Sequence, residues 1–263
     1  MTAFAPRWIA LAALACCAVG GLSVRAEIPL NERHSSYEDM SPDNKAMQDE
    51  DTANPAMLAV LDGEALWQTK AGSADKSCAD CHGDAKVRMK GVAARYPSYD
   101  ARTNQPLNIE QRINMCHTGR QKAAPFAFEG REMLALTTYV ELQSRGEPIA
   151  PPDDPRLTPH RERGRELYNQ RIGQLNLACV HCHDDNWGKS LAGAKIPQAH
   201  PTGYPIYRLE WQSVGSLQRR LRNCMIGMRA EPYPYGAREM VDLELYLMWR
   251  ARGMKVETPA VRP

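Results

Sequence analysis

Two copies of one short cysteine motif constrain this chain more than any other feature. Residues 179–183 read Cys-Val-His-Cys-His, and residues 78–82 read Cys-Ala-Asp-Cys-His. Two thiols at this spacing can form thioethers with the two vinyl groups of one porphyrin, and the histidine that follows can bind the iron as its proximal ligand. One such match is weak, but two in the same local setting indicate a c-type cytochrome with two covalently bound haem c groups. The predicted attachment sites are Cys78 and Cys81 for haem 1 and Cys179 and Cys182 for haem 2, with His82 and His183 on the two irons.

The sequence around each motif is repeated as well. A glycine lies 15 residues before the first cysteine of each motif, and a Tyr-Pro pair lies 20 residues before a later cysteine, which gives the pairs Gly63 and Gly164, Tyr96 and Tyr204, and Cys116 and Cys224. Apolar helices are predicted to close the two halves at 133–145 and 240–252. Each glycine would let the first and last helices of its half cross closely. The equal offsets favour an internal repeat over unrelated amphipathic helices.

The repeat predicts a mainly α fold made of two tandem class I cytochrome c-like domains with long loops, plus an N-terminal extended arm. We expect a signal peptide at 1–26, the arm at 27–56, domain 1 with haem 1 at 57–147, a linker at 148–159, and domain 2 with haem 2 at 160–263. The linker is rich in proline, which favours a stiff, extended spacer. The arm is acidic and lacks apolar periodicity, so it either wraps the surface or a partner, or is disordered.

Residues 1–26 have the pattern of a secretory signal. Arg7 supplies a basic start, 8–24 is an apolar run without charge, and Val24-Arg25-Ala26 resembles a cleavage site. A membrane anchor is the alternative, because the run is only slightly shorter than a membrane span. Haem c attachment requires export, and no later stretch could span a bilayer. We therefore expect a periplasmic protein without a membrane span after cleavage.

Composition narrows the partners and the cysteine chemistry. The net charge is +2 with 24% charged residues, which does not favour nucleic acid as a partner. Of the 8 cysteines, two lie in the leader and four in the motifs. The two that remain, Cys116 and Cys224, are called the lone cysteines below.

The lone cysteines are the best candidates for the sixth position on the two irons. They occupy equivalent places past each motif, where a distal loop would return over the porphyrin. A disulfide between them is the alternative in an oxidising compartment, but it would require equivalent points of two domains to face each other. His117 is a weaker candidate for the first iron. A thiolate ligand lowers the reduction potential of a haem, which suggests a task beyond carrying electrons.

Arginines gather around Cys224. An arginine cluster beside a cysteine lowers the pKa of the thiol and attracts anions. A solvated basic face, or partners for haem propionates, would account for some of the cluster. We predict that Arg220 and Arg229, which flank Cys224, bind an anion.

The motifs, the lone cysteines and the run 220–225 together resemble the SoxA subunit family of the thiosulfate-oxidising cytochrome complex of sulfur bacteria. The resemblance covers nearly the whole chain after the leader. It implies that each iron has a histidine and a cysteine ligand, which here are His82 with Cys116 and His183 with Cys224. It also implies Cys224 as a cysteine persulfide intermediate and Arg220 as the active-site arginine.

The same resemblance implies partners and a reaction. The partners are a monohaem cytochrome c subunit, SoxX, and the carrier protein SoxYZ. The reaction is that of L-cysteine S-thiosulfotransferase, in which thiosulfate is joined oxidatively to the carrier cysteine to give a cysteine S-thiosulfonate, and cytochrome c haem takes the electrons.

Two other functions fit the motif spacing. One is a dihaem electron-transfer cytochrome c without chemistry of its own, and the other is a thiosulfate dehydrogenase that forms tetrathionate. The lone cysteine in each half and the arginines near Cys224 favour the transferase.

Overall fold

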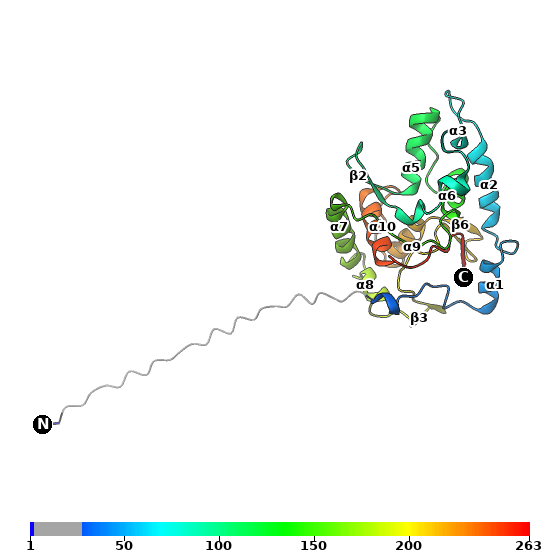
Figure 1. The fold of residues 1–263 in the computed structure, drawn as a ribbon. Coiled ribbons are helices and arrows are strands. Elements are labelled where there is room, and N and C mark those ends of the chain that lie inside the picture. The colour runs from blue at the N-terminus through cyan, green and yellow to red at the C-terminus, as the bar shows by residue number, and fades with distance from the viewer. Residues whose placement is uncertain (3–27) are drawn as a thin grey trace.

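Two similar helical halves follow one another in the computed structural model, which describes residues 1–2 and 28–263 (Figure 1). The predicted signal peptide lies outside the described residues, apart from its first two. The first half contains α2 (Met57–Gln68), α3 (Cys78–His82), α4 (Ala85–Arg88), η2 (Ala93–Arg95), β1 (Ser98–Asp100), β2 (Gln105–Leu107), α5 (Ile109–Cys116), η3 (His117–Gln121) and α6 (Arg131–Leu142). The second contains η4 (Pro155–Leu157), α7 (Thr158–Asn169), α8 (Cys179–His183), β3 (Ser190–Leu191), β4 (Ala194–Lys195), β5 (Ile206–Arg208), β6 (Ser213–Gly215), α9 (Leu217–Gly227), α10 (Arg238–Arg250) and β7 (Ala260–Arg262). The mainly α fold with an internal repeat is as predicted.

Each half is held together where its opening helix crosses its closing helix. α2 packs on α6, and α7 packs on α10. A Cβ atom on Gly63 would lie 2.1 Å from the carbonyl oxygen of Ala135, and one on Gly164 would lie 2.0 Å from that of Asp242. Only glycine allows the two backbones to approach this closely, which confirms the role predicted for the two glycines.

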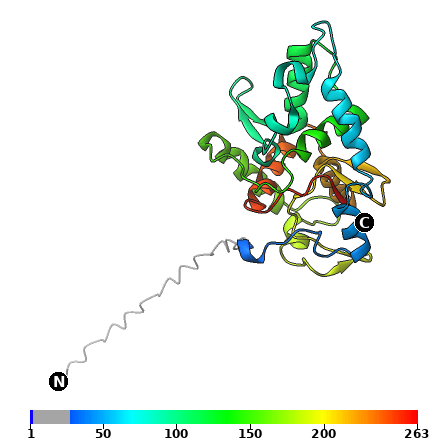
Figure 2. The same ribbon diagram turned by 45° about the vertical axis from the view of Figure 1, so that its right-hand side comes forward.

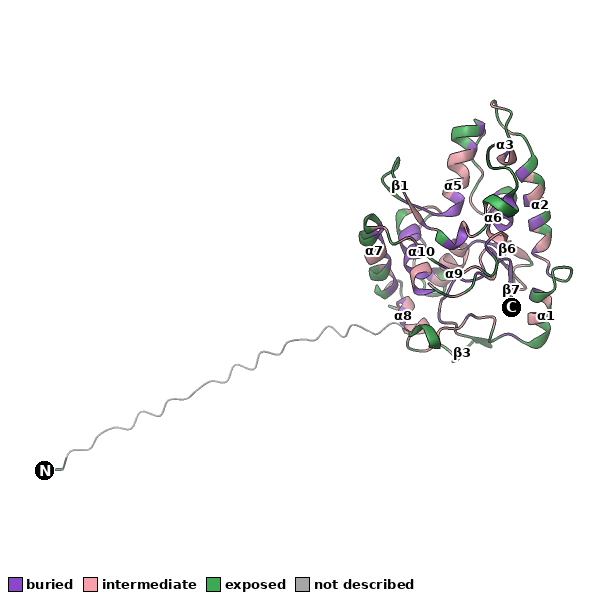
Figure 3. Ribbon diagram, viewed as in Figure 1, coloured by how far each residue is buried: buried purple, intermediate pink, exposed green. Residues whose placement is uncertain are grey.

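A buried aromatic residue lies behind each cysteine motif. The indole N–H of Trp67 donates a hydrogen bond to the carbonyl oxygen of Gly83 at 3.0 Å, and the hydroxyl of Tyr168 donates to the carboxylate of Asp184 at 2.7 Å. Gly83 and Asp184 directly follow the two motifs. The aromatic residues therefore fix the end of each motif to the core of its half, and α10 supplies much of the second core (Figure 3).

The closing helices begin and end earlier than the sequence predicts. α6 and α10 each start two residues before the expected position and stop three and two residues before the expected end. Turns end both helices, and each turn leads to a glycine with a positive φ, 83° at Gly146 and 84° at Gly253. Glycine adopts this left-handed conformation without a steric penalty, so it marks the chain reversal in both halves.

The strands are short and lie outside the helix crossings. β1 pairs antiparallel with β2, and β3 with β4. In the second half, β5 is the central strand of a three-stranded sheet, antiparallel to β6 and parallel to β7. The C-terminal strand β7 thus returns the chain end to the side of β5.

The segment expected to be an arm or disordered is fixed to the C-terminal end of the chain. It contains η1 (Leu30–Glu32) and α1 (Pro42–Asp49), and α1 lies beside β7 (Figures 1 and 2). The side-chain amide of Asn54 donates to the carbonyl oxygen of Pro259 at 2.9 Å, and the backbone N–H of His34 donates to Gln198 at 3.0 Å. The segment therefore packs on the second half although it precedes the first.

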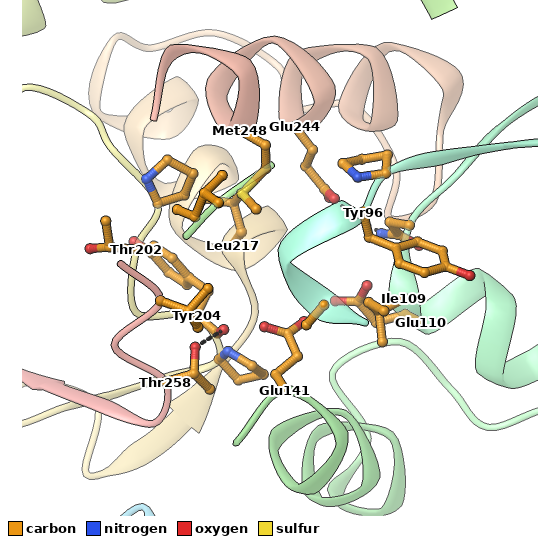
Figure 4. Close-up of a pocket in the computed structure, with 17 residues that line it drawn as sticks. Tyr96, Ile109, Glu110, Glu141, Thr202, Tyr204, Leu217, Glu244, Met248 and Thr258 are labelled. Carbon is orange, nitrogen blue, oxygen red and sulfur yellow. Dashed lines mark hydrogen bonds between the residues drawn. The ribbon is translucent and has the colours of Figure 1, made fainter. Parts of the chain in front are cut away.

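The two halves meet directly. A small apolar cluster of Ala94, Ile149, Ala251 and Val256 joins them, and Ile149 in the expected linker is only 1% exposed. Beside this cluster lies a cavity of about 50 Å³. Figure 4 shows three carboxylates directed towards it, from Glu110 on α5, Glu141 on α6 and Glu244 on α10.

Within the described part of the chain, no helix has the length and apolar character needed to cross a membrane.

Candidate functional site: a histidine and a cysteine across one cavity

The second cysteine motif forms the short helix α8. The helix begins after Ala178, whose N–H donates to Nδ1 of His181 at 3.0 Å and so caps the first turn. Cys179 and Cys182 lie three residues apart and share one face of the helix. Nδ1 of His183 lies 2.6 Å from the carbonyl oxygen of Pro197, so that nitrogen is the donor, and Nε2 is the ring nitrogen that could bind a metal.

Cys224 approaches α8 from α9. Its thiol is hydrogen-bonded to the ring of His183, and both side chains line a cavity of about 390 Å³, called the Cys224 cavity below. Burial by itself would raise the pKa of Cys224. The hydrogen bond from His183 and the positive charge of Arg220 outweigh burial and lower the pKa. The site therefore makes Cys224 more acidic than an ordinary cysteine, next to a histidine.

The Cys224 cavity suits a haem c group. Its volume is within the range of pockets that hold cofactors, about 300–1,000 Å³. His183 and Cys224 offer two axial ligands, and Cys179 and Cys182 offer the two thioether positions. Apolar side chains complete the lining, among them Pro197, Ala199, Ile206, Leu221 and Leu247.

The first motif forms a more open site. α3 begins with two reciprocal bonds, in which the N–H of Ser77 donates to the Asp80 carboxylate at 2.8 Å and the N–H of Asp80 donates to Ser77 Oγ at 3.0 Å. The ring of His82 lies 5.7 Å from that of Trp67. Cys81 and His82 are exposed, whereas their counterparts in the second half are half-buried.

Cys116 ends α5 beside the first motif. Burial raises the pKa of Cys78 to about 11, and the neighbouring Cys116 adds to that shift, so the two sulfurs belong to one site. His117 faces other partners. Its ring stacks on Phe126 with centroids 4.0 Å apart, and its Nδ1 lies 2.7 Å from Oε1 of Gln121. These contacts account for the burial of His117 without an iron.

All six cysteines of residues 28–263 are free thiols. The disulfide that was the alternative for the lone cysteines is therefore absent from this part of the chain, and each lone cysteine stays with its own motif. The same residues contain no group of three or more His, Cys, Asp or Glu side chains that could hold a bare metal ion. One histidine and one cysteine in each site could bind an iron whose other ligands would come from a porphyrin.

The two arginines predicted to bind an anion lie in different places. Arg220 lines the Cys224 cavity, whereas Arg229 is exposed and is not part of its lining. Burial lowers the pKa of Arg220, but the negative forms of Cys224 and Tyr204 outweigh burial and raise it. Arg220 therefore stays charged beside the thiolate.

Arg208 also lines the Cys224 cavity, and the sequence analysis missed it. It is the last residue of β5. A signal was present in the repeat: the offset between Tyr96 and Tyr204 is 204 − 96 = 108 residues, and the same offset aligns Arg208 with Asp100 of the first half.

Two repeated helical halves, each with an attachment motif on a short helix and an aromatic residue behind it, define a c-type cytochrome with two cytochrome c folds. Comparison with known families agrees. The model of the SoxA/TsdA cytochrome c domain matches residues 62–149 and 163–256. The chain therefore belongs to the SoxA/TsdA cytochrome c family, whose domains carry covalently bound haem c, and the resemblance found in the sequence is confirmed.

Individual relatives match over most of their length. The L-cysteine S-thiosulfotransferase subunit SoxA of Pseudaminobacter salicylatoxidans is 40% identical over 235 residues, which is 89% of this chain and 82% of the relative. The SoxA subunit of Rhodovulum sulfidophilum is 34% identical, over 88% of this chain and 81% of the relative. The crystal structure of SoxXA from P. pantotrophus superposes with a TM-score of 0.85 at 31% identity, covering 88% of this chain and 87% of that one.

Proposed function

We propose that this chain is the catalytic subunit of a periplasmic L-cysteine S-thiosulfotransferase of the SoxAX type. It carries two haem c groups, on Cys78 and Cys81 and on Cys179 and Cys182, and it conjugates thiosulfate to the carrier cysteine of SoxYZ. One observation carries the proposal: Cys224 contacts the ring of His183 in a cavity that Arg220 also lines. A sulfur nucleophile and a buried cation in the same cavity match a small anionic sulfur compound as substrate.

We assign a separate role to each residue of the Cys224 cavity. Arg220 binds the sulfonate end of thiosulfate by charge-assisted hydrogen bonds, which leaves the outer sulfur free to react. His183, fixed through its bond to Pro197, and Cys224 would hold the iron of the second haem. Haem, when bound, supplies an acceptor that takes electrons one at a time.

The reaction balances with two electrons. The outer sulfur of thiosulfate either bonds directly to the carrier thiolate or bonds first to the Cys224 thiolate; in both cases one S–S bond forms and two electrons leave. On the second route the carrier thiolate then attacks the outer sulfur, a new S–S bond to the carrier forms, and the Cys224 thiolate is the leaving group. The carrier thiol gives up its proton to solvent before it attacks.

The partner and the compartment follow from separate observations. A relative has been solved as the complex SoxXA, and this chain covers 87% of the matched chain, which supports a monohaem SoxX subunit as the partner here. The leader at 1–26 supports export to the periplasm.

Mass spectrometry tests the proposal. The holoprotein, its monohaem partner and the reduced carrier are incubated with thiosulfate and an oxidised cytochrome c, and the intact mass of the carrier is measured. We expect the carrier to gain one thiosulfate group, and the intact mass of this chain to show two haems. Tetrathionate formed without the carrier would support a thiosulfate dehydrogenase instead, and reduction of the haems without either product would support a plain electron carrier.

A further inference from the structure

The two halves differ in the residue that faces the conserved arginine of the repeat. In the first half, Arg112 donates to the buried carboxylate of Asp100 at 3.0 Å and to the hydroxyl of Tyr96 at 3.3 Å. The offset of 108 aligns Arg112 with Arg220 (220 − 112) and Asp100 with Arg208 (208 − 100). The ion pair between Asp100 and Arg112 in the first half is therefore replaced by Arg208 and Arg220 at the aligned positions of the second half.

One carboxylate, that of Glu210, acts on both arginines of the second half, since it pairs with Arg208 and raises the pKa of Arg220. In the described part of the chain, Arg208 has one acidic partner, Glu210 at 3.3 Å, and the Glu210 side chain is 52% exposed. The Nε of Arg208 is buried and has no hydrogen-bond partner there. Among the same residues, no ion pair or hydrogen bond engages the Arg220 guanidinium. Two guanidinium groups thus face the Cys224 cavity with unused donors.

The other cations of this cavity are already engaged. Arg262 is paired with Glu257 at 2.6 Å, and Lys195 donates to the carbonyl oxygen of Gly188 at 3.1 Å. Burial lowers the pKa of Arg208, and the charge of Arg220 lowers it further. Two half-buried guanidinium groups that line one cavity repel each other unless an anion lies between them, so the arrangement favours a bound anion.

We propose that Arg208 and Arg220 together form the binding site for the sulfonate oxygens of thiosulfate, with the outer sulfur directed at Cys224. The inference rests on the proposed function and adds a second substrate-binding residue to it. The planar forks of two guanidinium groups can hold two or more sulfonate oxygens at once, which fixes the orientation as well as the charge of the anion. The first half, where Asp100 occupies this position, would exclude an anion.

Three variants at one position test the proposal in the holoprotein with its partner and carrier. Arg208→Ala should raise KM for thiosulfate by about 10- to 100-fold, the range expected for lost hydrogen bonds to a charged group. Arg208→Lys should recover part of that loss. Arg208→Asp should be at least as severe as the alanine variant, because its carboxylate would pair with Arg220 as Asp100 pairs with Arg112. Arg229→Gln, which removes an exposed arginine outside the cavity, is the control and should leave KM within about twofold.

Two further measurements separate the inference from its alternatives. The haem spectrum and reduction potential are recorded for each variant, and the dissociation constant for thiosulfate is measured by calorimetry on the oxidised protein without carrier. Unchanged KM and binding in Arg208→Ala, or a shifted potential with unchanged thiosulfate binding, would overturn the proposal, the second result assigning Arg208 to the haem propionates. If the wild-type protein does not modify the carrier, the proposed function fails, but the calorimetry still decides whether Arg208 binds the anion.

Discussion

The two halves share a frame and differ in the groups that surround the lone cysteine. The frame is the same in both: a glycine at the helix crossing, an aromatic residue fixed behind the motif, and a glycine with positive φ after the closing helix. The surroundings differ. The first motif is exposed and its arginine is neutralised by Asp100, whereas the second faces a cavity with Arg208 and Arg220.

This difference separates the residues that stabilise both halves from those that distinguish the site of the second half. The shared glycines and the aromatic residue of each half serve packing, which a simple haem-binding half would also need. The change from Asp100 to Arg208 lies at the Cys224 cavity, where it adds positive charge. The second half therefore has the features of a reaction site, and the first half has those of a haem-binding unit alone.

The largest expected effect comes from removing Cys224, and removal of Cys116 is the comparison in the first half. If conjugation proceeds through the Cys224 thiolate, as on the second proposed route, Cys224→Ala should lower the rate of carrier conjugation by about 1,000-fold or more, because it removes that nucleophile. Cys116→Ala should change the spectrum of haem 1 but cost far less activity. Single-turnover kinetics with the carrier measure both. If Cys224→Ala kept full activity, or if both variants lost activity equally, the assignment of catalysis to the second half would be wrong.

Alanine at the two helix crossings tests the shared frame. In Gly164→Ala, the new Cβ would start 2.0 Å from the carbonyl oxygen of Asp242, and in Gly63→Ala 2.1 Å from that of Ala135. Since backbone cannot move aside easily, each should lower the free energy of unfolding by about 2–3 kcal/mol. Thermal and denaturant unfolding of the holoprotein measure this.

Gly119→Ala is the matched control for these two variants, because nothing lies within 4 Å of its Cβ position. It should change stability by less than about 1 kcal/mol. A large loss at Gly164 with none at Gly63 would show that the two crossings are not equivalent.

The shared helix packing of the two halves could be predicted from the sequence because the residues that form it are repeated. Equal offsets to Gly63 and Gly164, and to Cys116 and Cys224, predicted the halves, the helix crossings and the sulfur side chains near each motif. The packing of the N-terminal segment on the second half could not be predicted, since a bond such as Asn54 to Pro259 has no local pattern. Arg208 was not predicted for another reason. It is one of 33 basic residues, and only its alignment with Asp100 indicates a role in the site.

The carboxylates between the halves predict a pH effect on stability. Burial, assisted by the charge of Glu129, raises the pKa of Glu110 to about 7, and burial also raises the pKa values of Glu141 and Glu244. The folded protein keeps the Glu110 proton up to neutral pH, whereas the unfolded chain releases it near the model-peptide pKa of about 4.3. The folded state binds more protons in this window, so the free energy of unfolding falls as pH rises from about 4.5 to about 7.

Glu110→Gln tests the contribution of Glu110 to the pH dependence of stability, and it gives the first half the residue type found at the aligned position of the second. The offset of 108 aligns Glu110 with Gln218 of the second half (218 − 110), so the variant installs the residue that the repeat already contains. It should remove a slope of up to about 1.4 kcal/mol per pH unit and make the variant more stable than the wild type at pH 8. Glu132→Gln, which removes an exposed carboxylate of α6, is the control. Identical pH slopes for the wild type and Glu110→Gln would contradict the prediction.

The smallest expected effect concerns the aromatic residue behind the second motif. Tyr168→Phe removes the hydroxyl that donates to Asp184, but Asp184 keeps its ion pair with Arg250 at 2.6 Å. Because the carboxylate is not left unpaired, the loss should be that of an ordinary hydrogen bond, about 1 kcal/mol in the free energy of unfolding. Tyr139→Phe is the control, since no hydrogen bond holds its hydroxyl in the described part of the chain. A loss well above 2 kcal/mol at Tyr168, together with a shifted haem 2 spectrum, would mean that this hydroxyl positions the motif rather than only stabilising the half.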